Sequence, residues 1–240
     1  VPLVVPEVNP QAILKHKGII ANPNCSTIIM VMALKPIYDL AKIKRVIVST
    51  YQAVSGAGKE GIDELDAQVR DHSEGREMTA NILPSASAEK HYPIAFNLIP
   101  QIDVFCDNLY TKEEMKMVNE TKKIMEDYEM RITATTIRVP VYRSHSESVN
   151  IELEKEVDLG AMREALAKFP GVTVQDDPSK QEYPMPLYTS EKDDVYVGRL
   201  RRDESCEKSY NMWVVGDQIR KGAALNTLQI AETMIKNGWI

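Results

Sequence analysis

The apolar run 28–34 constrains this chain more than any other stretch, because it is apolar on every side of a helix. Such a run predicts a helix buried in a core, not one lying on a surface. Asn22 and Asn24 are good helix caps, and Pro23 between them blocks helix upstream. Cys25 is therefore predicted at the positive end of a helix dipole. A thiolate is stabilised there, which makes the thiol a better nucleophile near neutral pH. The alternative is a small buried cysteine that only packs.

The composition is that of a globular chain with no nucleic-acid or membrane partner. Of its 240 residues, 43% are hydrophobic, and 35 acidic against 29 basic residues give a net charge of −6. These charges are spread along the chain and provide no basic field for DNA or RNA. No apolar run approaches the roughly 20 residues that span a bilayer, and no signal peptide is recognisable. We therefore expect neither nucleic acid nor membrane among the partners.

The cysteines indicate a reducing compartment. Cys25, Cys106 and Cys206 are odd in number and unrelated in spacing. A chain of this length can bury a core without disulfides, so we expect reduced thiols and a cytoplasmic protein. No Cys-x-x-Cys or His-x-x-x-His pair starts a metal site, so no metal is expected.

Periodicity and turn residues predict an α/β chain. The predicted strands are 1–9, 18–21, 44–52, 131–141 continuing to 153, 172–174, and a hairpin of 194–201 with 210–215. The predicted helices run from Cys25 to about 42, from 59 to about 69, from a capping box at Thr111 and Glu114 to about 127, from 158 to about 168, and from 222 to 237. Residues 71–88 are expected to be irregular, 91–103 an ordered, packed loop broken by prolines, and 180–190 a loop.

Arg138 and His145 pose a geometric question, since residues an odd number of positions apart point to opposite faces of an unbroken strand. If both side chains enter one site, a bulge or turn must separate them. The polar stretch 142–144 is where we expect it.

The parts of covalent thiol catalysis on an anionic substrate are all present. They are a nucleophile, a proton carrier, a clamp for a carboxylate and a backbone cradle, supplied by Cys25, His145, Arg138 and the glycine-rich turn 53–58. Each also has an ordinary explanation as a packed thiol, a hydrogen-bonded histidine, a strand-edge charge or a plain turn. Sequence separation does not reveal whether they meet.

Six blocks spread over the chain resemble bacterial aspartate-semialdehyde dehydrogenases, in the order in which that family has them. The blocks are 22–27, 49–58, 96–103, 113–116, 138–141 with 145–147, and 221–224 with 229–232. The resemblance implies a mixed, largely antiparallel sheet with covering helices, like the catalytic domain of glyceraldehyde-3-phosphate dehydrogenase. It implies NADP-dependent phosphorylating oxidation of aspartate semialdehyde to aspartyl phosphate by a homodimer. Biosynthesis of lysine, threonine and methionine runs this reaction in reverse.

The resemblance also implies roles for residues that match the family's site. Cys25 matches the nucleophile that ends as a thioester, which inorganic phosphate then cleaves. His145 matches the general acid/base, and Gln52 the residue that orients the reacting group. Arg138 matches the clamp on the substrate carboxylate, and Glu113 the residue near the substrate amine.

Two further groups match positions around phosphate and cofactor. Lys116 and Asn24 match positions near the phosphate, although Glu113 and Lys116 also have the spacing of an ordinary surface ion pair. The positions that match cofactor-facing residues are Ser55, Gly56, Asn226 and Gln229.

In the family, a Rossmann half with a glycine-rich dinucleotide turn precedes the stretch with which this sequence opens, and no such turn follows a first strand here. We expect 1–24 to be the last strand region of the NADP-binding domain and 25–220 the catalytic and dimerisation domain. Residues 221–240 are expected to form a helix that returns to the NADP-binding domain. The open alternatives are another phosphorylating acyl reductase such as N-acetylglutamyl-phosphate reductase, a thiol hydrolase or acyltransferase, and an inactive fragment or interaction module.

Overall fold

A six-stranded sheet forms the centre of the computed structural model, which describes residues 1–239. The strand order is β2-β1-β3-β6-β5-β4, in which β1/β2 and β4/β5 pair parallel and the other three pairs are antiparallel. The strands are β1 (Ile43–Gln52), β2 (Arg131–Arg138), β3 (His145–Leu153), β4 (Val172–Val174), β5 (Val195–Arg202) and β6 (Ser209–Gly216). The prediction of a mixed, largely antiparallel sheet is confirmed.

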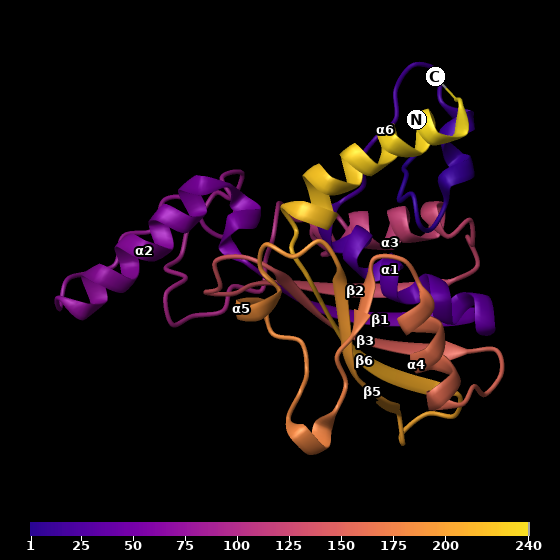
Figure 1. Cartoon of the computed structure of the whole chain (residues 1–240). Helices are drawn as coiled ribbons and strands as arrows, with labels where there is room; N and C mark the ends of the chain where they lie inside the picture. Colours follow the sequence, from indigo (N-terminus) through magenta and orange to yellow (C-terminus); the bar gives the residue numbers. More distant parts are fainter. Residues whose placement is uncertain (240) are drawn as a thin grey trace.

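Helices cover one face of this sheet, and two others project from it (Figure 1). The helices are α1 (Cys25–Leu40), α2 (Lys59–Ser73), α3 (Lys112–Ile124), α4 (Leu159–Lys168), the short α5 (Pro186–Thr189) and α6 (Leu225–Asn237). Helices α1, α3 and α4 pack on the sheet through one shared core, whereas α2 extends sideways and α6 lies beside both termini (Figure 1). No helix among residues 1–239 is long and apolar enough to cross a membrane.

Helix α1 is the centre of the core, as its apolar run predicts. Residues 28–34 are all fully buried, in one cluster with the inner faces of β1, β3, β5 and β6. Asn24 caps the helix, accepting the backbone N–H of Thr27 at its side-chain oxygen (3.1 Å). The capping box of α3 at Thr111 and Glu114 is likewise present in both directions. Local signals therefore placed both helix starts correctly.

The N-terminal segment differs from its prediction. Neither 1–9 nor 18–21 is a strand: they meet in a single β-bridge between Leu3 and Ala21, and a 3₁₀ helix, Pro10–Lys15, lies between them. Proline has no N–H to give to a ladder, so Pro2 and Pro6 prevent regular pairing. The segment instead packs its Val4, Ala12 and Ile13 side chains against Ile230 of α6.

The predicted continuous strand from 131 to 153 is also wrong. It consists of β2 and β3, which are not neighbours, because β1 lies between them. The chain turns through 139–144, and Ser144 adopts a left-handed conformation (φ 68°). The predicted turn at 142–144 is therefore confirmed, but it reverses the chain across β1 instead of bending one strand.

Three smaller features complete the comparison. The hairpin β5–β6 and the packed loop 91–103, with Ile94 and Ile99 buried, are as predicted. Leu83, from the stretch expected to be irregular, is buried in the same cluster. The loop 180–190 contains short helix α5, and α6 is preceded by a π-helical turn, Arg220–Ala224, which the sequence does not signal. That turn lies against the start of α1.

Candidate active site

Cys25 is the first residue of α1 and is half-buried. The backbone of the π-helical turn lies directly on it, since a Cβ on Gly222 would stand 3.0 Å from the Cβ of Cys25. A side chain at Gly222 would therefore push against Cys25. The thiol therefore lies at a helix start, as predicted. We call the backbone at Gly222 that lies against it the Gly222 wall.

The expectation that the helix dipole stabilises a thiolate is wrong for this resting site. Burial raises the pKa of Cys25 to about 12, and the negative charge of Glu113 raises it further, whereas Arg138 and the Ser26 hydrogen bonds work the other way. Desolvation of a charged group outweighs a helix terminus when water is excluded. Burial thus favours the neutral thiol of Cys25, and the Arg138 charge and the Ser26 hydrogen bonds offset this only in part.

Three strand ends bring the other predicted side chains to the same edge of the sheet. Gln52 ends β1 beside Arg138, which ends β2, and the two are register partners. His145 begins β3, which runs antiparallel to β1. All three side chains are buried. The turn at 139–144 is what allows Arg138 and His145 to meet.

A second glycine forms a backbone wall against Arg138 and His145. A Cβ on Gly56, in the 3₁₀ turn Val54–Ala57, would stand 2.8 Å from Nη1 of Arg138 and 3.3 Å from Cε1 of His145. The glycine-rich turn 53–58 thus brings Gly56 against Arg138 and His145, while Gly222, which was not part of the predicted cradle, lies against Cys25.

Hydrogen bonds fix the polar groups in the site. The amide nitrogen of Gln52 donates to Oε1 of Glu113 (3.2 Å) and lies 3.4 Å from Nε2 of His145. Asn24 Nδ2 donates to the same Glu113 oxygen (2.8 Å). Glu113 thereby joins the cap of α1 to the end of β1.

Arg138 is held by backbone oxygens. Its Nη1 donates to Ala53 O (2.7 Å) and its Nε to Pro84 O (3.3 Å), and Nη2 has no partner among the described residues. Burial lowers the pKa of Arg138, and the Glu113 charge opposes that shift. An anchored guanidinium with a free end is suited to binding an anionic group.

His145 is fully buried, and burial together with the nearby Arg138 charge holds its pKa well below its usual value. The backbone N–H of Ala53 donates to Nδ1 (3.1 Å). A neutral imidazole that accepts at Nδ1 carries its proton on Nε2. His145 therefore presents an N–H donor to the site.

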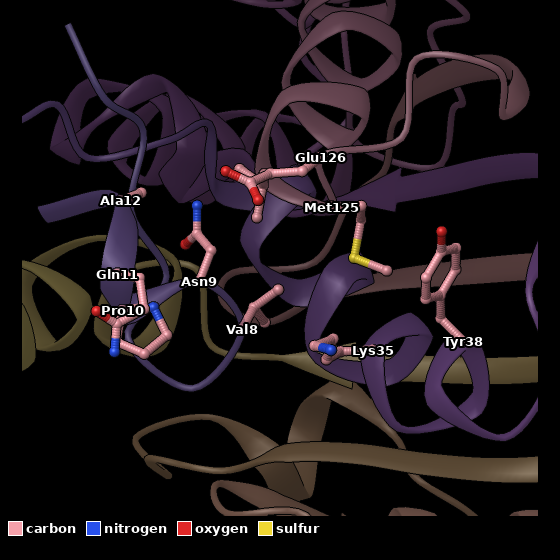
Figure 2. A pocket seen from close by; sticks show the side chains of 10 residues that line it. Val8, Asn9, Pro10, Gln11, Ala12, Lys35, Tyr38, Met125 and Glu126 are labelled. Carbon is pink, nitrogen blue, oxygen red and sulfur yellow. The ribbon is translucent and has the colours of Figure 1, made fainter. Parts of the chain in front are cut away.

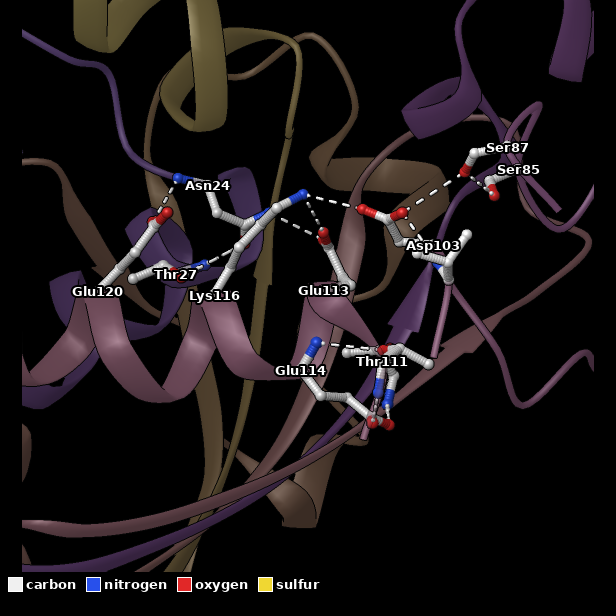
Figure 3. Close-up of polar contacts among 12 residues, drawn as sticks. Asn24, Thr27, Ser85, Ser87, Asp103, Thr111, Glu113, Glu114, Lys116 and Glu120 are labelled. Atoms are coloured by element: carbon white, nitrogen blue, oxygen red, sulfur yellow. Dashed lines mark hydrogen bonds and ion pairs between the residues drawn. The ribbon is translucent and has the colours of Figure 1, made fainter. Parts of the chain in front are cut away.

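Lys116 lies at the edge of the site and is 44% exposed at its side chain. Its Nζ stands between Oδ2 of Asp103 (3.2 Å) and Oε2 of Glu113 (3.4 Å), as Figure 3 shows. Burial works to lower the pKa of Lys116, but the Glu113 and Asp103 carboxylates outweigh it and raise the pKa. Glu120, one turn further along α3, accepts the backbone N–H of Asn24 (2.7 Å) (Figure 3).

The four candidate cofactor positions divide into two groups. Ser55 and Gly56 belong to the site, and the Ser55 hydroxyl accepts a hydrogen bond from Gln218 (2.5 Å). Asn226 and Gln229 lie on α6 in a separate buried cluster, where both accept from Nζ of Lys221 (3.2 and 2.7 Å). The Asn226 amide nitrogen is also engaged, by Val4 O and Asn22 Oδ1, so this side chain has little capacity left for a ligand.

Several polar residues around the site were missed from the sequence. No local pattern marks them: Glu120, for example, accepts from the backbone of Asn24, and Glu147 has no hydrogen-bond partner among the described residues. They are Asp103, Glu120, Glu147, Asp217 and Gln218 near the site, and Lys221 in the cluster on α6.

No cluster of three or more His, Cys, Asp or Glu side chains within residues 1–239 could hold a metal ion. A hollow of about 220 Å³ between the N-terminal segment, α1 and the end of α3 is lined by Asn9, Lys35, Tyr38 and Glu126 among others (Figure 2). It contains none of the predicted site residues.

Comparison with known proteins decides the family. Residues 34–221 match the protein family described as "semialdehyde dehydrogenase, dimerisation domain". Aspartate-semialdehyde dehydrogenase of Aquifex aeolicus is 55% identical over all of this chain and 69% of its own length, and that of Bacillus subtilis is 52% identical over 98% and 68%. The chain belongs to the aspartate-semialdehyde dehydrogenase family. It is therefore an oxidoreductase related to amino-acid biosynthesis.

Solved aspartate-semialdehyde dehydrogenases have the same fold. Aspartate semialdehyde dehydrogenase II from Vibrio cholerae, complexed with ASA, matches with a TM-score of 0.91 at 47% identity, covering 98% of this chain and 68% of that one. The enzyme from Candida albicans with NADP matches with a TM-score of 0.71 at 25% identity, covering 100% and 68%. The predicted family and fold are thus confirmed.

Proposed function

We propose that the site between Gly56 and Gly222 converts aspartate semialdehyde and inorganic phosphate to aspartyl phosphate, with NADP as cofactor. The single observation that carries this is the meeting of Cys25, Arg138 and His145 from three separate elements between two glycine walls. A nucleophile, an anion-binding group and a proton donor are what addition to an anionic aldehyde needs.

Cys25 and His145 perform the addition. The Cys25 sulfur forms a bond to the aldehyde carbon as the carbonyl oxygen takes the Nε2 proton of His145, and the thiol proton replaces it on Nε2, so the imidazole stays neutral. His145 is suited to this exchange at Nε2 because its Nδ1 is already engaged by the Ala53 N–H. When the adduct is oxidised the carbon becomes a thioester on Cys25, and the proton of its oxygen leaves through the same imidazole to water.

Arg138, Glu113 and Gln52 orient the substrate. The free Nη2 end of Arg138 binds the α-carboxylate, and Glu113 lies across the site for the α-ammonium group. Gln52, whose amide is fixed by Glu113, holds the reacting carbonyl. Such positioning converts an encounter into a near-attack geometry.

Lys116 and Asn24 receive phosphate. A phosphate oxygen attacks the thioester carbon, the carbon–sulfur bond breaks, and the Cys25 thiolate leaves from aspartyl phosphate. Nζ of Lys116 is already held at the edge of the site by two carboxylates, and phosphate replaces part of that pairing.

Two glycines leave bare backbone beside the reacting groups. A Cβ on Gly56 would stand 2.8 Å from Nη1 of Arg138 and one on Gly222 3.0 Å from the Cβ of Cys25, so a cofactor that reaches the thiol would meet backbone and no side chain at these two positions. Bound NADP would supply the hydride acceptor there. Ser55 would contact it from the Gly56 turn, with Gln229 nearer the end of α6, and Asn226 would support Asn22 instead of touching the cofactor.

The domain boundaries and assembly follow the family. Residues 1–24 and helix α6, which share a small core of their own, would form part of the NADP-binding side, and 25–220 the catalytic domain. The open face of the sheet would bind a second copy to form a homodimer, consistent with the name of the matching family. A cytoplasmic location accords with three unpaired cysteines.

Protection of Cys25 from alkylation tests this proposal. Aspartate semialdehyde should slow iodoacetamide labelling of Cys25, read by peptide mass spectrometry, without affecting Cys206, which is exposed. Propanal, which lacks the carboxylate, should not protect, and Arg138→Met should abolish protection. Equal protection by both aldehydes, or none by either, would refute the assignment of the site.

A further inference from the structure

Asp217 is a fully buried carboxylate that the proposed chemistry does not use. It follows β6 directly, and four N–H groups from three different segments converge on it. Its Oδ1 accepts the backbone N–H groups of Ile219 (2.9 Å) and Arg220 (3.3 Å), at the start of the π-helical turn. Its Oδ2 accepts from the backbone of Glu191 (2.7 Å) and from Nη2 of Arg143 (2.7 Å).

One side of this junction leads to the wall over Cys25. The two backbone N–H groups that Oδ1 of Asp217 accepts lie at the start of the turn that carries Gly222, and the backbone N–H of Gly222 donates to Asp217 O (3.3 Å). The carboxylate therefore caps the turn and fixes where its backbone lies on the thiol.

The other side leads to the wall over His145. Arg143 lies in the loop 139–144, which carries the Gly56 turn through two backbone hydrogen bonds. They run from the N–H of Val54 to Val141 O (2.8 Å) and from that of Ser55 to Tyr142 O (3.3 Å). The Asp217–Arg143 ion pair thus connects the Gly222 wall to the Gly56 wall.

A neighbouring side chain repeats the connection. Gln218 accepts the backbone N–H of Ser144 (3.0 Å) and donates to the hydroxyl of Ser55 (2.5 Å). The 3₁₀ turn that carries Gly56 and the π-helical turn that carries Gly222 are far apart in the sequence. The Asp217 carboxylate is fully buried while the Arg143 side chain is 26% exposed, and burying a carboxylate costs desolvation free energy. The pair therefore points to a geometric use rather than to a gain in stability.

We propose that the Asp217–Arg143 pair is a positioning device that fixes the separation of the two glycine walls across Cys25 and His145. It acts through Gly222 on one side and the loop 139–144 on the other, and touches no reacting atom itself. This inference rests on the proposed function, because it assumes that substrate and cofactor bind between those walls.

The chain offers a matched control. Asp176 is also a buried carboxylate paired with an arginine, accepting from Nε of Arg163 (2.9 Å) and from the backbone of Arg199 (2.7 Å). It belongs to the β4–β5 side of the sheet, away from the strand ends that form the site. Asp176→Asn should therefore reproduce the loss of a buried pair without moving either wall.

The test measures steric access to Cys25. N-ethylmaleimide, a bulky reagent, and iodoacetamide, a small one, are reacted with the protein, and the ratio of their rates is taken at each cysteine. Asp217→Asn and Arg143→Met should raise this ratio at Cys25 roughly fivefold, about 1 kcal/mol of activation barrier. The ratios at Cys106 and Cys206 should not change, and Asp176→Asn should leave all three as they are.

The outcomes separate this inference from the proposed function. If wild-type Cys25 is protected by aspartate semialdehyde but its ratio is unchanged in Arg143→Met and Asp217→Asn, the positioning role is wrong and the proposed function stands. A ratio that rises equally at all cysteines, or equally in Asp176→Asn, indicates general loosening and also refutes the role. If Asp217→Asn does not fold, Arg143→Met decides.

Discussion

Ala53 donates its backbone N–H to Nδ1 of His145 over 3.1 Å, and this contact decides which nitrogen of the imidazole carries the proton. The neutral ring must then be protonated at Nε2, the nitrogen that faces Gln52 and the site. A backbone donor cannot be lost by a side-chain rotation, so the same tautomer is held whenever His145 is neutral.

His145 should therefore not titrate near the ordinary histidine pKa of about 6.5. Burial and the Arg138 charge hold its pKa well below that value, so the unfolded chain takes up the proton first as pH falls. The folded state should lose stability below about pH 6.5 from this residue alone. Nitrogen-15 NMR of labelled histidine should show a neutral Nε2–H ring, assigned by its loss in His145→Gln. An NMR signal of His145 that titrates near pH 6.5 would contradict the prediction. The His145→Gln variant should also lose activity by roughly 10²–10⁴-fold.

Removing the charge of Glu113 should make Cys25 more reactive. The pKa of Cys25 is raised to about 12 by burial and then by Glu113, so Glu113→Gln removes an opposing charge and lowers that pKa. At a fixed pH below 12, alkylation of Cys25 should be several times faster than in wild type, while Cys206 stays constant as a control. A slower Cys25 in the variant would show that Glu113 does not act through its charge.

Glu147 should make the folded state less stable as pH rises. Both carboxylate oxygens are buried without a partner among the described residues, and burial holds its pKa well above the usual value. Above about pH 4.5 the unfolded chain releases this proton while the folded chain keeps it. Stability should therefore decline by about 1.4 kcal/mol per pH unit until the folded pKa is reached.

Glu147→Gln should remove that slope. Urea unfolding as a function of pH measures it, and Glu204→Gln, at an exposed position, serves as the control with an unchanged slope. Glu147 is the cross-strand partner of Thr50, and the Thr50 hydroxyl donates to Gln52 (3.0 Å). Glu147→Gln, which keeps the size of the side chain, should therefore retain activity better than Glu147→Ala. Parallel slopes in wild type and Glu147→Gln would mean that Glu147 is ionised in the fold.

Local sequence signals predicted the helices and the position of the nucleophile. The Asn24 cap, the apolar run behind it and the capping box at Thr111 each act within one or two turns, so each is visible in a short window. The half-buried strands were also recognisable by alternation. The family resemblance then supplied the roles of residues that these patterns alone left open.

Long-range pairing was not predictable in the same way. Nothing local to Arg138 or His145 shows that β1 runs between their strands, because sheet order depends on contacts far apart in the sequence. The prediction of a stabilised Cys25 thiolate failed for the same reason. The helix start is a local feature, but the burial that raises the pKa of Cys25 comes from other elements. Asp217 and Lys221 were missed because the charged partners in their ion pairs, Arg143 and Glu7, lie more than seventy residues away in the chain.

Lys221 should be essential to the junction between the N-terminal segment and α6. Its ammonium group is 1% exposed and lies 2.5 Å from Oε2 of Glu7, with Asn226 and Gln229 as further acceptors. Burial lowers the pKa of Lys221 and the Glu7 charge opposes that shift, so removing the lysine leaves an unpaired buried carboxylate.

Lys221→Met should lower the free energy of unfolding by about 3–5 kcal/mol, whereas Glu7→Gln with Lys221→Met should lower it by less than the sum of the single changes. Urea unfolding measures all three proteins. Lys35→Met is the control, because its pair with Asp39 is on the surface and should contribute less than about 1 kcal/mol. Equal losses in Lys221→Met and Lys35→Met would show that the buried pair does not hold the junction. A large loss that Glu7→Gln fails to relieve would instead assign the stabilisation to Asn226 and Gln229, the two amides that share the same ammonium group.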